Sequence, residues 1–137
     1  MAQAVVFDCD GTLLQVNGVH SPLVFEGVLQ LLEVLQVHNI PMYIWTGRDR
    51  SSLMRHFEKL GLLHFFDDFY CAEDGPSKPS PFGLNKLLGP GPHEDVWVIG
   101  DSSVDMCGGR EARLKTCLLY TSPSPRDRQK SRMPSSA

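Results

Sequence analysis

Short apolar runs alternate along this chain with longer segments in which apolar residues recur at helical spacing. The runs predict strands over residues 4–7, 40–45, 66–71, 96–100 and 116–120. The periodic segments predict helices over residues 23–37, 50–60, 80–88 and 103–114. Strands that alternate with helices are typical of a doubly wound sheet. We therefore predict an α/β fold with a Rossmann-like parallel sheet of about five strands and flanking helices.

Local signals predict where some of these elements begin and end. Ser21 followed by Pro22 is typical of an N-cap and a first helical position, so it predicts the start of the first helix. Gly61 predicts the end of the second helix, because a glycine often closes a helix in the left-handed conformation. The strand over residues 66–71 is the weakest, since Asp67 and Asp68 interrupt its apolar pattern.

Polar side chains follow three of the predicted strands, and one more lies in a loop. The four segments are VVFDCDGTLL, YIWTGR, PSKPSP and VWVIGDSSVDM. The side chains are Asp8, Asp10, Thr46, Lys78, Asp101 and Asp105. Ligands of open α/β sheets bind beyond the carboxyl ends of the strands, where these residues should meet. Four carboxylates, a hydroxyl and an ammonium suit a hard cation and a phosphoryl group. The pattern therefore predicts an enzyme.

The four motifs, in this order, resemble those of the haloacid dehalogenase-like hydrolases and specifically their phosphatase branch. The resemblance covers roughly residues 4–119. It implies that Asp8 attacks phosphorus to form an aspartyl phosphate. It also implies that Asp10 acts as general acid toward the leaving alcohol and then as base for the hydrolytic water. The second aspartate of the DxD motif fits the phosphatase branch, since the dehalogenases of this family have a DxY motif at that place.

The same resemblance implies a Mg²⁺ site and a substrate site. Mg²⁺ would be held by Asp8, Asp101 and the backbone carbonyl of Asp10, with Asp105 supporting the site directly or through water. The substrate-binding residues would be Thr46, Gly47, Arg48 and Lys78. Two of these have a second interpretation from the residues alone. Thr46 can cap the following helix, and Arg48 can form a surface ion pair instead of meeting the leaving group.

Many phosphatases of this family insert a helical cap between the first and second motifs. Only 35 residues separate Asp10 from Thr46, and core elements fill most of this interval. The interval from Thr46 to Lys78 is filled in the same way. We therefore expect a phosphoglycolate-phosphatase-like core without a cap domain.

Composition narrows the possible partners. The net charge is −3, and residues 121–137 carry four basic residues and one acidic residue, which leaves −6 for residues 1–120. An acidic body argues against nucleic-acid binding, and no apolar run has transmembrane length. The four cysteines lie in or beside apolar segments without metal-like spacing, so we expect small buried thiols in a reducing compartment. The five histidines show no paired spacing and are expected to be solvated or capping groups.

We expect a phosphatase core over residues 1–120 that lacks its true C-terminal end, followed by a disordered basic tail over 121–137 whose composition indicates a non-native segment. The predicted function is Mg²⁺-dependent hydrolysis of a small phosphorylated metabolite in the cytoplasm, with no nucleic-acid or membrane partner and with the oligomeric state open. One alternative is a receiver-like phospho-acceptor domain, although the third strand has no aspartate at its tip. Another is an inactive interaction protein derived from this family.

Overall fold

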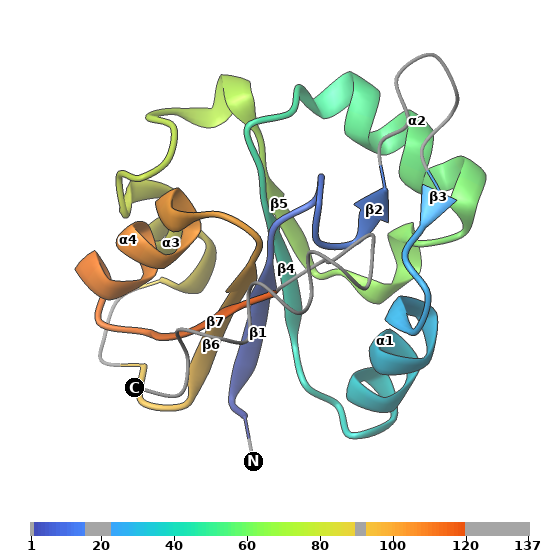
Figure 1. The fold of residues 1–137 in the computed structure, drawn as a ribbon, viewed down its shortest axis with the longest axis horizontal. Helices are drawn as coiled ribbons and strands as arrows, with labels where there is room; N and C mark the ends of the chain where they lie inside the picture. The colour runs from blue at the N-terminus through green and yellow to red at the C-terminus, as the bar shows by residue number, and fades with distance from the viewer. Residues whose placement is uncertain (1, 16–22, 90–92, 120–137) are drawn as a thin grey trace, which may run out of the picture.

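The computed structural model describes residues 2–15, 23–89 and 93–119, and these form a parallel sheet with helices on both faces (Figure 1). The sheet has five strands in the order β5-β4-β1-β6-β7, which confirms the predicted fold class. Its strands are β1 Ala4–Phe7, β4 Met42–Trp45, β5 Asp68–Tyr70, β6 Val96–Gly100 and β7 Lys115–Leu118. Each neighbouring pair is parallel.

Alternate residues of the central strand β1 enter two separate hydrophobic cores, as expected for a strand buried on both faces. Val5 and Phe7 join the core that α1 and α2 cover. Ala4 and Val6 join the core on the other face, beneath α3 and α4 (Figure 1). The four helices are α1 Val28–Val37, α2 Arg50–Leu60, α3 Phe82–Leu88 and α4 Ser103–Glu111. Short 3-10 turns at Leu63–Phe65 and Ala72–Asp74 complete the connections.

The predicted start of the first helix is wrong. Leu23–Val24 form a short strand, β3, which pairs in antiparallel fashion with β2, Leu14–Gln15. The helix begins only at Val28, after Gly27 has turned the chain with a positive φ of 87°. The cap predicted at residues 21 and 22 lies outside the described residues. The apolar residues at 23 and 24 therefore extend a hairpin rather than the helix.

The remaining boundaries differ from prediction by a few residues at most. The predicted strands over 4–7 and 96–100 and the helix over 50–60 are confirmed at both ends. The helix over 103–114 ends at Glu111, and the strand over 66–71 is shortened to β5. Between Asp10 and Lys78, the described residues contain core elements and no separate cap domain. The predicted tail over 121–137 lies outside the described residues.

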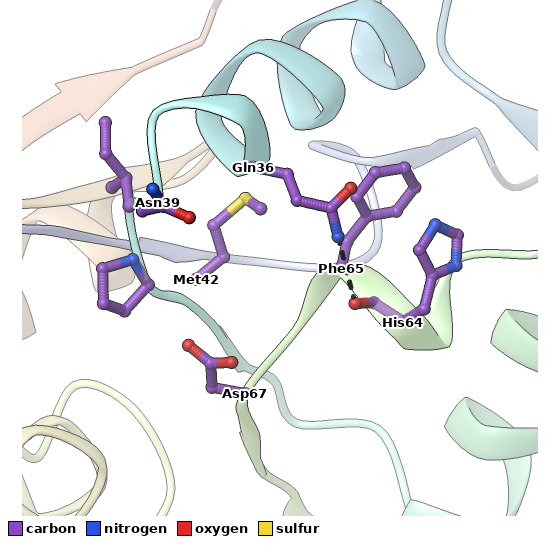
Figure 2. Close-up of a pocket in the computed structure, with 8 residues that line it drawn as sticks. Gln36, Asn39, Met42, His64, Phe65 and Asp67 are labelled. Carbon is purple, nitrogen blue, oxygen red and sulfur yellow. Dashed lines mark hydrogen bonds between the residues drawn. The ribbon is translucent and has the colours of Figure 1, made fainter.

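A pocket of about 220 Å³ opens near the amino-terminal ends of β4 and β5 (Figure 2). Its lining includes Gln36 and Met42 on one side and His64 and Asp67 on the other. The side-chain amide of Gln36 donates to the His64 carbonyl at 3.4 Å. None of the predicted site residues lines this pocket, because they follow the opposite ends of the strands.

The packing of α3 and α4 against the sheet depends on the indole of Trp45, the last residue of β4, which is only 1% exposed. Each helix approaches the indole through a glycine. A Cβ on Gly83 of α3 would lie 2.6 Å from Trp45 Nε1 and 2.7 Å from the Tyr70 ring. A Cβ on Gly108 of α4 would overlap the indole and lie 3.0 Å from the Pro79 carbonyl oxygen. Any larger side chain at these positions would push a helix away from β4.

We expect Gly83→Val to lower the free energy of unfolding by about 2–3 kcal/mol more than Asn85→Val, its matched control. Both variants place a valine in α3, and replacing a glycine would by itself favour the helix, so helix propensity cannot account for the expected loss. Only Gly83 faces rigid rings, whereas Asn85 is exposed. Urea denaturation followed by circular dichroism measures the difference. Equal midpoints for the two variants would contradict this account of the packing.

Candidate active site

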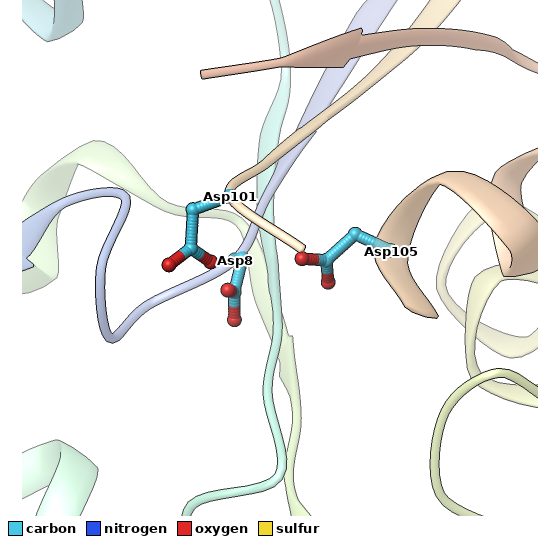
Figure 3. A group of neighbouring side chains, drawn as sticks. All are labelled: Asp8, Asp101 and Asp105. Carbon is cyan, nitrogen blue, oxygen red and sulfur yellow. The ribbon is translucent and has the colours of Figure 1, made fainter. Parts of the chain in front are cut away.

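The polar residues of the four motifs meet at the carboxyl edge of the sheet because the strands that carry them are neighbours. β1 lies between β4 and β6, with Phe7 opposite Ile44 on one side and Ile99 on the other. Asp8, Thr46 and Asp101 therefore follow three adjacent strand ends. Asp105 reaches the same place from the first turn of α4 (Figure 3).

Three carboxylates form a compact cluster at this edge. Asp8, Asp101 and Asp105 each offer an oxygen, and these oxygens all lie within 4.8 Å of one another (Figure 3). The backbone of Asp8 is fixed by its N–H, which donates to the Ile99 carbonyl at 2.9 Å. One Asp8 oxygen, Oδ1, also accepts from the Cys9 N–H at 2.8 Å. Asp101 is exposed and Asp105 is fully buried, so the cluster extends from the surface into the protein.

Two glycines make room for these carboxylates. Gly11 adopts a φ of +83°, and a Cβ there would lie 2.7 Å from Asp101 Cγ. A Cβ on Gly100 would lie 2.6 Å from Asp105 Cβ. Asp105 is further oriented by Ser102, the N-cap of α4, whose hydroxyl donates to Asp105 Oδ2 at 2.9 Å. The glycines of DGT and GDSS are thus required for close approach as well as for turning.

Lys78 supplies the positive charge inside the cluster. Its ammonium donates to Asp8 Oδ1 at 2.9 Å and also to Asp105 Oδ1. The ammonium lies 4.8 Å from the centroid of the Trp45 ring, and the Lys78 side chain is 11% exposed. A lysine in a solvated loop would not make these contacts, and the structure places the Lys78 ammonium beside Asp8.

Burial raises the pKa of Asp8 to about 7, against the opposing effect of the Lys78 ammonium. The neighbouring Asp105 raises it further by like-charge repulsion. A divalent cation beside this cluster would favour the charged carboxylate instead. In the metal-free protein, an additional positive charge would therefore stabilise the carboxylate cluster.

Asp10 turns toward Arg48 and forms a two-point ion pair with it. Arg48 Nη2 lies 2.5 Å from Asp10 Oδ1, and Nε lies 3.2 Å from Oδ2. Arg48 thus forms an ion pair, as its second interpretation expects, and its partner is itself a predicted catalytic residue. The remaining guanidinium nitrogen, Nη1, contacts Ser52 Oγ at 2.8 Å and His56 Nδ1 at 2.6 Å.

Thr46 is buried, and its hydroxyl oxygen accepts from the Arg48 N–H at 3.0 Å. It does not cap α2, because Asp49 is the N-cap and accepts from the Ser52 N–H. The hydroxyl hydrogen of Thr46 can therefore be donated to a ligand. At Gly47, nothing lies within 4 Å of the place that a Cβ would take, so a ligand can approach this backbone closely.

Sequence reasoning missed Ser52 and His56, which contact Arg48. Their spacing gave no clear signal, because Arg48 precedes α2 and only Ser52 and His56 lie four residues apart on that helix. The expectation for the cysteines was also only partly right. Cys9 and Cys71 are buried, whereas Cys107 is exposed and Cys117 is half-buried. Burial raises the pKa of Cys9, as expected for a small buried thiol.

The donor set fits a divalent cation such as Mg²⁺. Carboxylate oxygens are its preferred protein ligands. In the part of the chain that the structure describes, Asp8, Asp10 and Asp105 pair with two cationic side chains, Lys78 and Arg48. With Asp101 included, the site keeps a formal charge of −2, which a divalent cation would neutralise.

Comparison with known proteins places the chain in a family. A family model of haloacid dehalogenase-like hydrolases matches residues 16–119. The chain belongs to this family. Among curated proteins, this haloacid dehalogenase-like hydrolase is similar to the pyrophosphatase PpaX of Halalkalibacterium halodurans, with 30% identity over 105 residues. The match covers 73% of the chain and 49% of PpaX, so the chain spans about half the length of this relative.

Solved structures of the family share the fold. A hydrolase of the superfamily from Ehrlichia chaffeensis is similar with a TM-score of 0.76 and 19% identity, over 96% of this chain and 97% of that one. The YfnB protein of Bacillus subtilis, solved bound to magnesium, has a TM-score of 0.63 and 31% identity, over 70% of this chain and 45% of YfnB. Among the described residues of the present hydrolase, no helix has the length and apolarity to cross a bilayer.

Removing the ammonium from the cluster should destabilise the metal-free protein. We expect Lys78→Met to lower the free energy of unfolding by about 3 kcal/mol at pH 8 with a chelator present, because Asp105 is buried and would lose its cation. The matched control is Lys86→Met, since Lys86 is exposed on α3 and should change the free energy by less than about 0.5 kcal/mol. Urea denaturation provides both values, and similar losses would show that the cluster does not need Lys78.

Proposed function

We propose that this chain is a Mg²⁺-dependent phosphomonoester hydrolase that acts through an aspartyl phosphate on a small phosphorylated metabolite. The observation that carries the proposal is the position of Asp8. Its carboxylate lies within 4.8 Å of two further carboxylates and 2.9 Å from the Lys78 ammonium. The proposed nucleophile, the proposed cation site and a positive charge that could bind phosphoryl oxygens would thus meet at one strand end.

In this proposal an oxygen of Asp8 attacks phosphorus while the bond from phosphorus to the leaving oxygen breaks. Lys78 already contacts Asp8, so its ammonium would stabilise the equatorial oxygens as charge develops on them. The Thr46 hydroxyl would donate to one of the same oxygens, with the Gly47 backbone beside it. Arg48 would bind the part of the substrate that leaves.

Asp10 would move the protons of both half-reactions. It protonates the leaving oxygen when the ester is cleaved, and it later accepts a proton from the water that attacks the aspartyl phosphate. Water then restores the free Asp8 carboxylate and releases inorganic phosphate. Asp10 lies two residues beyond Asp8, and its side chain is 43% exposed, so it borders the solvent from which water arrives.

Mg²⁺ would be held by Asp8, Asp101 and the Asp10 backbone carbonyl, with Asp105 in support. The cation supplies the positive charge that lets an anionic carboxylate approach an anionic phosphate. At an effective dielectric constant of about 20, two unit charges about 4 Å apart repel by about 4 kcal/mol. Magnesium in YfnB supports this assignment, since YfnB is similar to this chain over most of the chain's length.

A small substrate is favoured by the chemistry of the surroundings. Residues 1–120 carry a net charge of −6, so they offer no general attraction for nucleic acid. The relative from Halalkalibacterium is named a pyrophosphatase, which supports a compact phosphate compound as the substrate. The receiver-like alternative is weakened by family membership and by the tip of β5, where Tyr70 is followed by Cys71 and not by an aspartate.

Asp8→Asn should abolish turnover while the fold persists. We expect the release of phosphate from p-nitrophenyl phosphate with Mg²⁺ to fall by roughly 10³-fold or more, because an amide cannot act as the nucleophile. Asp67→Asn is the matched control, since Asp67 is an exposed aspartate outside the site. Circular dichroism confirms folding of both variants. Wild-type-like rates in Asp8→Asn would rule out the covalent mechanism.

Two aspartates should separate metal binding from proton transfer. We expect Asp101→Asn to weaken Mg²⁺ affinity at least about tenfold, because a carboxylate ligand becomes a neutral amide. Asp10→Asn should keep the Mg²⁺ dissociation constant within about threefold yet lose about 10²–10⁴-fold in turnover. Isothermal titration with Mg²⁺ and steady-state kinetics measure the two effects. Equal loss of affinity in both variants would contradict the division of roles.

A further inference from the structure

The contact between Arg48 and Asp10 occupies the residue that the proposed mechanism needs for proton transfer. One carboxylate oxygen of Asp10 accepts from Nη2 at 2.5 Å and the other from Nε at 3.2 Å. Both carboxylate oxygens are thus engaged by Arg48, and a leaving group has to compete with the guanidinium for them. If Asp10 is the acid, Arg48 has to release it during turnover.

The other end of the guanidinium is held by α2. Nη1 of Arg48 donates to Ser52 Oγ at 2.8 Å and to His56 Nδ1 at 2.6 Å. A neutral imidazole can accept at Nδ1, and burial together with the nearby Arg48 lowers the pKa of His56. Arg48 has a side chain that is only 13% exposed, compared with 43% for Asp10. The arginine is therefore anchored on α2, and Asp10 is its more accessible partner.

An anion is the natural competitor for this arginine. A guanidinium binds a carboxylate or a phosphate with the same two-point geometry. A substrate that carries a second anionic group next to its scissile phosphate could therefore replace Asp10 on Nη2 and Nε. The contacts to Ser52 and His56 use Nη1, so they can persist during this exchange.

We propose that Arg48 is an exchangeable partner of Asp10, and that a second anionic group on the leaving part of the substrate takes over Arg48 and frees Asp10 to act. The proposal rests on the hydrolase function proposed above and narrows its substrates to doubly anionic phosphate compounds. Ser52 and His56 are positioning residues, since they keep the guanidinium near the site when it leaves Asp10.

The proton balance of the exchange is simple. Once released, Asp10 takes a proton from solvent and gives it to the leaving oxygen as the bond from that oxygen to phosphorus breaks. The bond from Asp8 to phosphorus forms in the same step. Water later cleaves the aspartyl phosphate and returns a proton to Asp10. Asp10 then releases this proton to solvent, and its carboxylate pairs with Arg48 again after both products have departed.

The test compares two esters that differ in one group, ethyl phosphate and 2-phosphoglycolate, with Mg²⁺ present. The second carries a carboxylate where the first has a methyl group. We expect wild-type kcat/KM to be at least about tenfold higher for 2-phosphoglycolate. Arg48→Ala should lower kcat/KM about tenfold or more for 2-phosphoglycolate and raise it for ethyl phosphate, since Asp10 is then free without an anion.

Further variants separate exchange from a structural role. Arg48→Lys keeps the charge but loses the fork, so it should show an intermediate preference. Ser52→Ala and His56→Ala should raise the KM for 2-phosphoglycolate more than the KM for ethyl phosphate. Arg55→Ala is the matched control, because Arg55 is an exposed arginine on α2, and it should leave the ratio between the two esters unchanged.

The outcomes distinguish the proposed exchange from the hydrolase function on which it rests. If wild-type protein hydrolyses both esters and Arg48→Ala loses rate equally on both, the exchange is overturned and the hydrolase function stands. A wild-type preference for ethyl phosphate would also overturn the exchange alone. If folded wild-type protein that binds Mg²⁺ hydrolyses neither ester nor p-nitrophenyl phosphate, both proposals are overturned.

Discussion

The contact of one ammonium with two carboxylates organises this molecule. Lys78 lies between Asp8, at the end of the central strand, and Asp105, which is fully buried in α4. Removing either charge from water is costly unless an opposite charge is supplied. Because the same ammonium lies over Trp45, the charge between the two carboxylates also rests on the residue against which α3 and α4 pack. The carboxylate cluster and the packing of the two helices therefore share one contact.

Much of the site could be predicted because its residues are placed by short-range rules. A buried strand such as Val96–Gly100 is an apolar run that stops at a polar residue, and in a parallel sheet such ends share one edge. Helix α2 begins after Asp49, whose side chain caps its first turn, and ends at Gly61, which adopts the left-handed conformation. Both signals act within a few residues of the chain. The closeness of Asp8 to Asp101 then follows from the adjacency of β1 and β6.

What could not be predicted depends on contacts between distant segments. Leu23 and Val24 fit the helical pattern that follows them, and only their pairing with β2 makes them a strand. His56 resembles any half-exposed helical histidine until the direction of the Arg48 side chain is known. The sequence likewise could not show that Arg48 forms an ion pair, because its partner Asp10 lies 38 residues away in the chain.

The position of Trp45 has an optical consequence. The chain has two tryptophans, and each lies beside a lysine, Trp45 near Lys78 and Trp97 near Lys115. Only Trp45 is next to the carboxylate cluster, and indole emission responds to nearby charge and to the mobility of its surroundings. Any ligand that shifts the Lys78 ammonium changes the field across a fully buried ring. The protein therefore contains its own fluorescent reporter of events at the site, and Trp97 provides an internal reference away from it.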